Sequence, residues 1–247
     1  MDSVYANQYR DLYQNHWWWR SREREILRQL ESQLGEPDGS KRILDVGCGD
    51  GLFFDELGHF GEVTGIEGDP ETLSPNGKWR EQIHLRMFDR TFEPGVQYDA
   101  ILMLDILEHM PDPEGALQHA RKLLAPGGVL IATVPAFMAL WTSHDDLNHH
   151  VIRYRSDNFC PLVTESGFQI RKSSYLFHWT CPVKLMIALK EKIFGAKPQP
   201  PQVPSSWVNA ACHFLSRLEQ ATISRLPMPF GSSLMVIGSN DQGIVPK

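Results

Sequence analysis

The chain has 247 residues, of which 42% are hydrophobic, and its formal net charge at pH 7 is −6. This length allows one large domain or two small ones with a buried core, and the acidic balance argues against a general nucleic-acid-binding protein. The four cysteines form no CxxC pair, so neither a zinc site nor a disulfide framework is predicted. Because no signal-peptide pattern and no apolar run of membrane-spanning length is found, we expect a cytoplasmic protein.

The first predicted element is a helix that includes HWWWRSRERE, residues 16–25. In a helix, the three consecutive tryptophans Trp17, Trp18 and Trp19 fan over about 200°. One core-facing stripe cannot bury all three of them. The far side of this helix therefore needs a second partner.

Apolar runs typical of β-strands recur at residues 42–46, 63–67, 83–88, 98–104 and 128–134. Between them, residues 51–60, 71–80 and 113–124 have the polarity or spacing of helices. Strands that alternate with helices predict βαβ units and a parallel sheet. Residues 41–135 are therefore expected to form five strands of a doubly wound α/β sheet.

The C-terminal part continues with a helix that ends at Gly167, a strand at 169–177 and a final apolar strand at 232–239. Two amphipathic helices, at 182–194 and 205–226, are joined by the Pro-rich segment 197–204. They predict a helical hairpin inserted before the last strand. Residues 182–227 hold four lysines and two arginines against two glutamates, so this insertion is basic within an acidic chain.

The segment ILDVGCGDG, residues 43–51, starts as a buried strand and breaks into Gly47, Gly49 and Gly51. Glycines let the backbone approach a ligand closely, and a following helix offers unpaired N–H groups. Glu67 ends the next strand, where a carboxylate can accept hydrogen bonds from both ribose hydroxyls. A dinucleotide fingerprint would require glycine where Leu52 stands, which disfavours an NAD- or FAD-dependent oxidoreductase.

This glycine pattern, preceded by Asp45, resembles the first motif of class I S-adenosylmethionine (SAM)-dependent methyltransferases. Residues 98–113 and 123–135 resemble the fourth- and fifth-strand motifs of the same family. The resemblance implies a Rossmann-like, seven-stranded, mostly parallel sheet, with SAM as cofactor and S-adenosylhomocysteine as product. It implies a cofactor site that includes Asp45, Gly47, Cys48, Gly49, Glu67, Gly68, Asp89, Met103 and Leu104, with Asp89 at the adenine amino group.

The sequence DILEH follows the fourth strand. If Asp105 starts a helix, then Asp105, Glu108 and His109 share one face and form a candidate site for a hard divalent cation. The stretch also resembles ubiquinone-biosynthesis O-methyltransferases, in which an acid-x-x-Glu-His pattern is linked to a divalent metal. The alternative is an N-cap at Asp105 with Glu108 in a capping-box variant, and we favour this cap and predict no metal. His109 is separately a candidate acid or base.

Histidines are concentrated after the fifth strand, in the segment of residues 140–159. His144 and His150 are candidate catalytic bases because histidine exchanges protons near neutral pH. His144, Asp145, His150, Arg153 and Tyr154 resemble an HD…H..RRY pattern of a broad bacterial methyltransferase group, although Ile152 replaces the first arginine of the pair. We expect a substrate pocket formed by Trp19, Asp105, His149, Arg153 and Tyr154; the alternative is that these residues only pin a loop.

The segments HWWWRSREREIL and MPFGSSLMVIG resemble the same bacterial group, so the resemblance covers nearly the whole chain. It implies an N-terminal helix that folds over the SAM pocket and an insertion that covers the substrate. We therefore expect at least one of the three tryptophans to line that cleft, and Arg20 or Arg22 to pair with the SAM carboxylate. The alternative for the arginines is a solvated helix face.

The expected organisation is an N-terminal helical lid (1–36), a SAM-binding core (37–180), a helical hairpin cap (181–228) and a last strand with a tail (229–247). The predicted function is SAM-dependent methylation of a small-molecule acceptor, apolar or lipid-linked, at oxygen. Methylation at nitrogen and a catalytically silent SAM-binding module are the alternatives. The basic amphipathic insertion can cap the substrate or rest on an anionic membrane, and we favour the cap.

Overall fold

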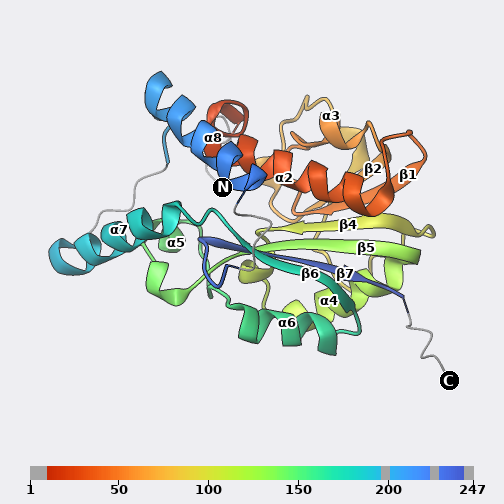
Figure 1. The fold of residues 1–247 in the computed structure, drawn as a ribbon. Helices are drawn as coiled ribbons and strands as arrows, with labels where there is room; N and C mark the ends of the chain where they lie inside the picture. Colours follow the sequence, from red (N-terminus) through yellow and green to blue (C-terminus); the bar gives the residue numbers. More distant parts are fainter. Residues whose placement is uncertain (1–9, 196–200, 223–227, 242–247) are drawn as a thin grey trace.

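The fold is centred on a seven-stranded sheet with the strand order β3-β2-β1-β4-β5-β7-β6 (Figure 1). The computed structural model describes residues 10–195, 201–222 and 228–241. Strands β1 to β5 pair in parallel, whereas β7 lies antiparallel between β5 and β6. The predicted doubly wound, mostly parallel α/β sheet is thus confirmed. In the part of the chain that is described, no helix is long and apolar enough to cross a bilayer.

The strands coincide closely with the apolar runs of the sequence. They are β1 (Lys41–Val46), β2 (Gly61–Glu67), β3 (Ile83–Leu85), β4 (Tyr98–Leu104), β5 (Leu124–Pro135), β6 (Gln169–Leu176) and β7 (Ser233–Ser239). The helices are α2 (Trp17–Leu34), α3 (Phe54–Leu57), α4 (Pro113–Leu123), α5 (Ser143–Leu147), α6 (Ser156–Glu165), α7 (Thr180–Phe194) and α8 (Ser206–Ala221). Residues 10–15 are also helical.

Two hydrophobic cores cover the two faces of the sheet, because side chains alternate along each strand. Ile43 of β1 belongs to one core, with Ile26 and Leu30 of α2. Leu44, its neighbour in sequence, belongs to the other core, which α4 and α6 close. Helix α2 therefore covers one face of the sheet with its buried inner side, and its role as a lid stays a prediction.

Some predicted helices between the strands are shorter than expected. Of residues 51–60 only Phe54–Leu57 form an α-helix, and residues 71–80 contain only part of two 3-10 turns, Pro70–Thr72 and Arg80–Gln82. Glycine at positions 51, 58 and 77 and proline at 75 interrupt both segments. Strand β3 ends at Leu85, not at residue 88.

The insertion before β7 does contain two helices, but they pack on different neighbours. Helix α8 lies against α2, and α7 lies against the 3-10 turn Met138–Leu140. Figure 1 shows α7 and α8 diverging from each other. Residues 1–9 of the predicted lid, 197–200 of the Pro-rich segment, 223–226 of the second helix and the tail 242–247 lie outside the described residues.

Candidate functional site

The glycine-rich loop after β1 lies at the carboxyl edge of the parallel strands. Gly47, Gly49 and Gly51 all have positive φ angles of 76°, 55° and 70°, a region that favours glycine. A Cβ at Gly47 would lie 2.9 Å from the Ile106 side chain. The loop therefore depends on glycine both for its backbone conformation and for the close approach of the β4 loop.

Glu67, at the end of β2, is held by the backbone of this loop. Its Oε2 accepts a hydrogen bond from Gly49 N at 2.9 Å, and its Oε1 accepts one from Asp69 N at 2.8 Å. Burial raises the pKa of Asp45, behind the loop, to about 7, while Arg22 opposes that shift. A fixed carboxylate beside glycine N–H groups can bind the hydroxyls of a ribose.

An apolar surface adjoins Glu67 that the sequence analysis did not single out. Leu85 and Met87 are 43% and 62% exposed, and the Met87 sulfur would lie 2.7 Å from a Cβ at Gly68. Such a surface can stack on a flat ring. Asp89 follows on the exposed side, where Thr91 N–H donates to its Oδ1 at 2.8 Å.

Arg22 of α2 reaches the end of β4 and forms an ion pair with Asp105. Asp105 has φ +54°, and its N–H donates to Thr133 O. The turn that follows, Leu107–His109, is a 3-10 turn whose N-cap is Ile106. The predicted helix that starts at Asp105 and its capping box are therefore wrong, because the chain turns sharply at Asp105 and the carboxylate points to Arg22.

Two of the three tryptophans, Trp17 and Trp18, pack on Phe177. Trp17 packs on Phe177 and Trp179, with ring centroids 6.1 and 5.1 Å away. The Arg22 guanidinium lies over the Trp18 ring, 4.9 Å from its centroid, and Trp19 packs edge-on against Trp18. Trp18 thus borders the residue that reaches Asp105, and the prediction that a tryptophan lines the cleft rests on Trp18.

Arg20, two positions before Arg22, points elsewhere. It is exposed and lines a neighbouring hollow of about 680 Å³ together with Tyr13, Glu23 and Trp79. Two positions in a helix differ by about 200° around the axis, so both arginines cannot face one site. Of the two predicted candidates for the SAM carboxylate, the geometry favours Arg22.

A buried network joins α5 to the segment before α6. Asp145 is completely buried, and Arg153, 2% exposed, donates to both of its oxygens at 2.8 and 3.0 Å. His150 Nδ1 lies 2.8 Å from Asp145 Oδ1. Although burial alone would raise the pKa of Asp145, hydrogen bonds from His150 and Arg153 hold it well below its usual range. An ionised Asp145 places the His150 proton on Nδ1 and leaves Nε2 as an acceptor.

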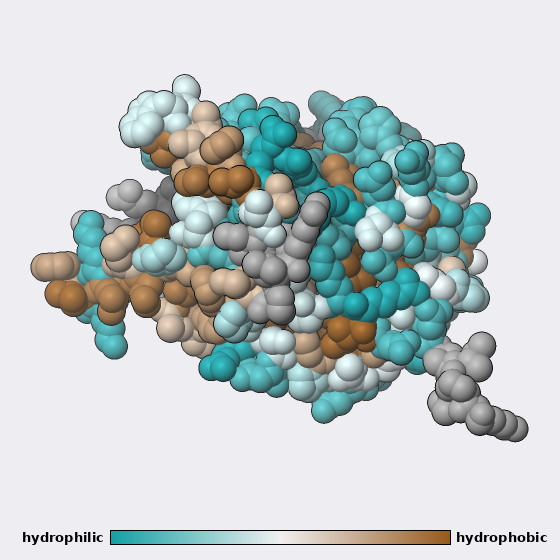
Figure 2. Space-filling model, viewed as in Figure 1, coloured by the Kyte–Doolittle hydropathy of each residue, from teal (hydrophilic) through white to brown (hydrophobic). Residues whose placement is uncertain are grey.

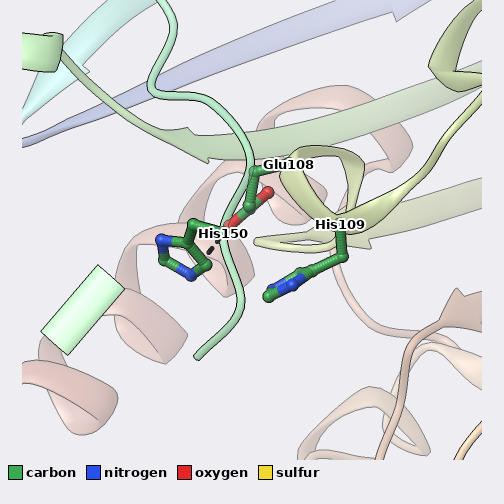
Figure 3. A group of neighbouring side chains, drawn as sticks. All are labelled: Glu108, His109 and His150. Carbon is green, nitrogen blue, oxygen red and sulfur yellow. Dashed lines mark ion pairs between the residues drawn. The ribbon is translucent and has the colours of Figure 1, made fainter. Parts of the chain in front are cut away.

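Glu108 lies on the other side of His150 (Figure 3). Its carboxylate is fully buried, neither oxygen has a hydrogen-bond partner, and its Oε1 is 3.9 Å from His150 Nε2. Burial, with Asp105 nearby, raises the pKa of Glu108 well above its usual value. The His109 ring packs 4.8 Å from that of His150. Figure 3 shows both rings beside the Glu108 carboxylate.

The side chains of Glu108, His109 and His150 form a candidate cation site. Ligand atoms of Glu108, His109 and His150 all lie within 4.8 Å of one another. His150, distant in sequence, replaces Asp105 in the candidate set Asp105, Glu108 and His109. Sequence spacing could not reveal this, since the loop between β5 and α6 brings His150 to the β4 loop.

Helix α7 contributes a residue that the sequence analysis missed. The Lys184 amine is close enough to Arg153, Asp145 and Asp105 for their charges to act on it, and burial lowers its pKa to about 8. Helix α7 is tied to α5 where Glu191 accepts hydrogen bonds from Ser143 N and Oγ. The sequence showed Lys184 only as one of the basic residues of the insertion, because amphipathic spacing does not tell which side of a helix is covered.

The side chains of Glu108, Asp145, His150 and Lys184 gather at one corner of the sheet's carboxyl edge. Several predicted residues lie away from this corner. Tyr154 belongs to the hydrophobic core beside Phe159, Met103 is fully buried, and His149 is exposed with φ +56°. His144 is hydrogen-bonded to Asn148, the residue that caps the end of its helix, and burial lowers the pKa of His144 to about 4. Cys48 Sγ contacts Gly49 O, and burial raises the pKa of its thiol. Arg153 holds Asp145 and is not a free anion site.

Comparison with known proteins also indicates a methyltransferase. A family model described as a methyltransferase domain matches residues 18–173. The ubiquinone biosynthesis O-methyltransferase of Pectobacterium carotovorum is 28% identical over 157 residues, which cover 60% of this chain and 64% of that relative. The protein of that name from Xanthomonas axonopodis is 31% identical over 145 residues, covering 51% and 60%.

The chain spans only part of these relatives: the matched share falls to 39% for the Psychrobacter cryohalolentis protein. Two solved structures show the same fold over a greater length. A SAM-dependent methyltransferase from Thermotoga maritima aligns with TM-score 0.57 and 15% identity, covering 97% of both chains. One from Archaeoglobus fulgidus aligns with TM-score 0.52 and 14% identity, covering 88% of this chain and 94% of that chain.

Proposed function

The chain belongs to the methyltransferase-domain family of class I SAM-dependent enzymes, and on this premise we propose that it methylates a hydroxyl oxygen of a small apolar acceptor. The observation that carries the proposal is His150, oriented by the buried Asp145 beside the carboxyl end of β4. Ligands of open α/β sheets bind outside this edge. Methylation of a hydroxyl oxygen needs a base at this edge to remove the hydroxyl proton. A neutral amine needs no such base, because it can lose its proton after the transfer.

The cofactor of the family is SAM, and the residues around the glycine loop fit it. In this proposal Glu67 would bind the ribose hydroxyls, Leu85 and Met87 would flank the adenine, and Arg22 would receive the amino-acid carboxylate. Bound SAM supplies a sulfonium methyl group that is already activated for in-line displacement. The chain must then align the acceptor, exclude water and remove one proton.

We assign proton removal to His150 Nε2. Asp145 holds Nδ1–H and so fixes the tautomer, and the fork of Arg153 holds Asp145. Lys184, near Asp145, and Trp18, beside Arg22, would orient the acceptor. His144 and His109, which were also predicted as catalytic, are weaker candidates for the base than His150. Neither of their rings is oriented by a carboxylate in the described structure.

The names of the curated relatives favour oxygen over nitrogen as the acceptor atom. The test is methyl transfer from radiolabelled SAM to a panel of apolar phenols, alcohols and amines. We expect methyl ethers, and we expect His150→Asn to lower kcat by about 10²- to 10⁴-fold while SAM affinity is retained. Transfer only to amines, or SAM binding without any transfer, would contradict this function and favour one of the two alternatives.

Asp145 is the positioning residue in this scheme. Asp145→Asn should lower kcat more than KM changes, because the His150 tautomer is no longer fixed. The matched control is Asp146→Asn, since Asp146 is exposed and accepts its hydrogen bond from Trp141. Equal effects of both variants would assign Asp145 a merely structural role.

A divalent cation is a second candidate at the same corner, favoured by the unpartnered oxygens of Glu108. Glu108, His109 and His150 would hold it, with Asp145 orienting the His150 ring. One carboxylate and two imidazoles suit a transition metal or zinc. Such an ion would supply Lewis-acid activation of the acceptor hydroxyl.

Calorimetric titration with Mn²⁺ and Zn²⁺ tests this site. If the site is real, micromolar binding in the wild type should weaken at least tenfold in Glu108→Gln, because a charged ligand is lost. Activity that survives exhaustive chelation would remove the metal from the mechanism and leave His150 as the base.

A further inference from the structure

Helix α7 has its polarity inverted with respect to an ordinary surface helix. Its polar side chains face the protein: Thr180 is buried, Lys184 is only partly exposed, and Glu191 accepts from Ser143. Its apolar side chains face solvent. Met186, Ile193 and Phe194 are 63%, 70% and 80% exposed.

Helix α8 is arranged in the same way. Its inner face is joined to α2 and the start of α7 by polar contacts, in which Asn209 accepts from Trp17 N, Ser216 from Trp179 Nε1, and Gln220 donates to Ser21 O. Its outer face carries Trp207, 76% exposed, and Phe214, 64% exposed.

Exposed apolar side chains are concentrated on these two helices. Among the described residues, seventeen large hydrophobic side chains are exposed, and seven of them lie on α7 and four on α8. Figure 2 shows hydrophobic surface along the projecting α7. Exposed apolar surface that is gathered in one region of a protein marks an interaction site. These side chains are Val183, Leu185, Met186, Ile187, Leu189, Ile193, Phe194, Trp207, Phe214, Leu215 and Leu218, which we call the outer apolar face.

The charge around this face favours one occupant. Lys190 and Lys192 are exposed on α7 and Arg217 is exposed on α8, whereas the chain as a whole carries −6. The one acidic residue of α7, Glu191, is engaged by Ser143. A two-fold dimer through this face would bring its basic side chains together, whereas anionic lipid headgroups would neutralise them.

We propose that the outer apolar face docks on an anionic lipid bilayer, with α7 and α8 lying in its interface. Amphipathic helices with basic residues at the polar boundary bind membranes in this manner. The inner face of α7 borders the corner of Lys184, Asp145 and His150. If the proposed function holds, docking brings that corner to the surface from which an apolar acceptor would enter.

Vesicle flotation with the full chain tests the proposal. The probes are phosphatidylcholine vesicles with and without 30 mol% phosphatidylglycerol. We expect the wild type to float with the anionic vesicles and Phe194→Glu to lose at least tenfold in affinity. Replacing Lys190 and Lys192 together by glutamine should cost about fivefold for each lysine on anionic vesicles only.

The matched control is Val96→Glu, because Val96 is 40% exposed in a turn before β4, at the end of the sheet away from the glycine loop. It should bind vesicles as the wild type does. Wild-type protein that stays with the lipid-free fraction, or a dimer that Phe194→Glu converts to monomer in sedimentation equilibrium, would overturn the proposal. SAM affinity measured on the same samples separates this result from a failure of the proposed function, which does not depend on vesicles.

Discussion

Glu67 holds the glycine loop by a hydrogen bond and is also the proposed contact of the SAM ribose. Its two oxygens accept hydrogen bonds from Gly49 N and Asp69 N, so the carboxylate is oriented before any ligand arrives. Each hydrogen bond to a charged acceptor is worth about 1.5–3 kcal/mol. A ribose that binds through this carboxylate therefore depends strongly on it.

We predict that Glu67→Ala weakens SAM binding about 100-fold or more, through the loss of charged hydrogen bonds to the ribose. Glu67→Gln should lose less, because the amide keeps one acceptor oxygen. Isothermal titration calorimetry measures both affinities, and thermal unfolding checks that the loop still folds. An unchanged affinity in Glu67→Ala would place the ribose elsewhere.

Glu23 of α2 is a residue whose charge opposes folding. Burial raises its pKa to about 7, and nearby Glu56 adds to this, although Tyr13 donates a hydrogen bond to it. In the unfolded chain its pKa is about 4.3. The neutral form is therefore favoured in the folded protein, and its stabilising effect is full below pH 4 and lost as the pH rises through 7.

Accordingly, Glu23→Gln should raise the free energy of unfolding by about 1–2 kcal/mol at pH 8, discounted for partial exposure. The gain should shrink as the pH falls and vanish near pH 4. Urea unfolding at several pH values measures it. Glu36→Gln, in the exposed segment after α2, is the control, and an equal gain there or a gain independent of pH would refute this account.

At the scale of elements, α2 serves both the core and the site. Ile26 and Leu30 fasten it to the sheet, and this anchoring fixes the direction in which Arg22 points. Arg22→Ala should therefore reduce SAM affinity at least tenfold, since the charged pair between Arg22 and the amino-acid carboxylate of SAM is lost. Arg20→Ala should change it less than twofold, because Arg20 faces the neighbouring hollow.

Calorimetry on the two variants measures this difference directly. Trp18, whose ring lies beside Arg22 in the wild type, is retained in both variants, so neither change removes an aromatic side chain. If Arg20→Ala is the more damaging change, α2 must rotate on binding, and the assignment of Arg22 is wrong.

The sequence predicts the elements that local chemistry determines. The five apolar runs become β1 to β5 because buried parallel strands require continuous apolar residues, and the glycine loop follows from its spacing. It does not predict that Asp105 adopts φ +54°, since the turn depends on the contact with Arg22, 83 residues away in sequence. His150 reaches Glu108 only through the packed loop between β5 and α6, which no local pattern encodes. The outward apolar face of α7 is another such case, because amphipathic spacing alone does not tell which side is covered.

For the whole molecule, four segments that are far apart in sequence meet at the carboxyl edge of the sheet. They are residues 17–23 of α2, the loop 45–51, the end of β2 at 67–69 and the β4 loop at 103–107, linked by contacts of Glu67 with Gly49 and of Arg22 with Asp105. A ligand that contacts all four segments should stabilise them together.

We therefore predict that S-adenosylhomocysteine slows amide hydrogen exchange in all four segments at once, measured by mass spectrometry. Residues 94–97 and 125–128, at the opposite end of the strands, are the internal control and should exchange as before, because local opening there is not coupled to the site. NADH should protect none of these segments. Protection confined to the hollow that includes Tyr13, Ser74 and Trp79 would move the cofactor to the side of α2 that bears Arg20 and contradict the site derived from Glu67.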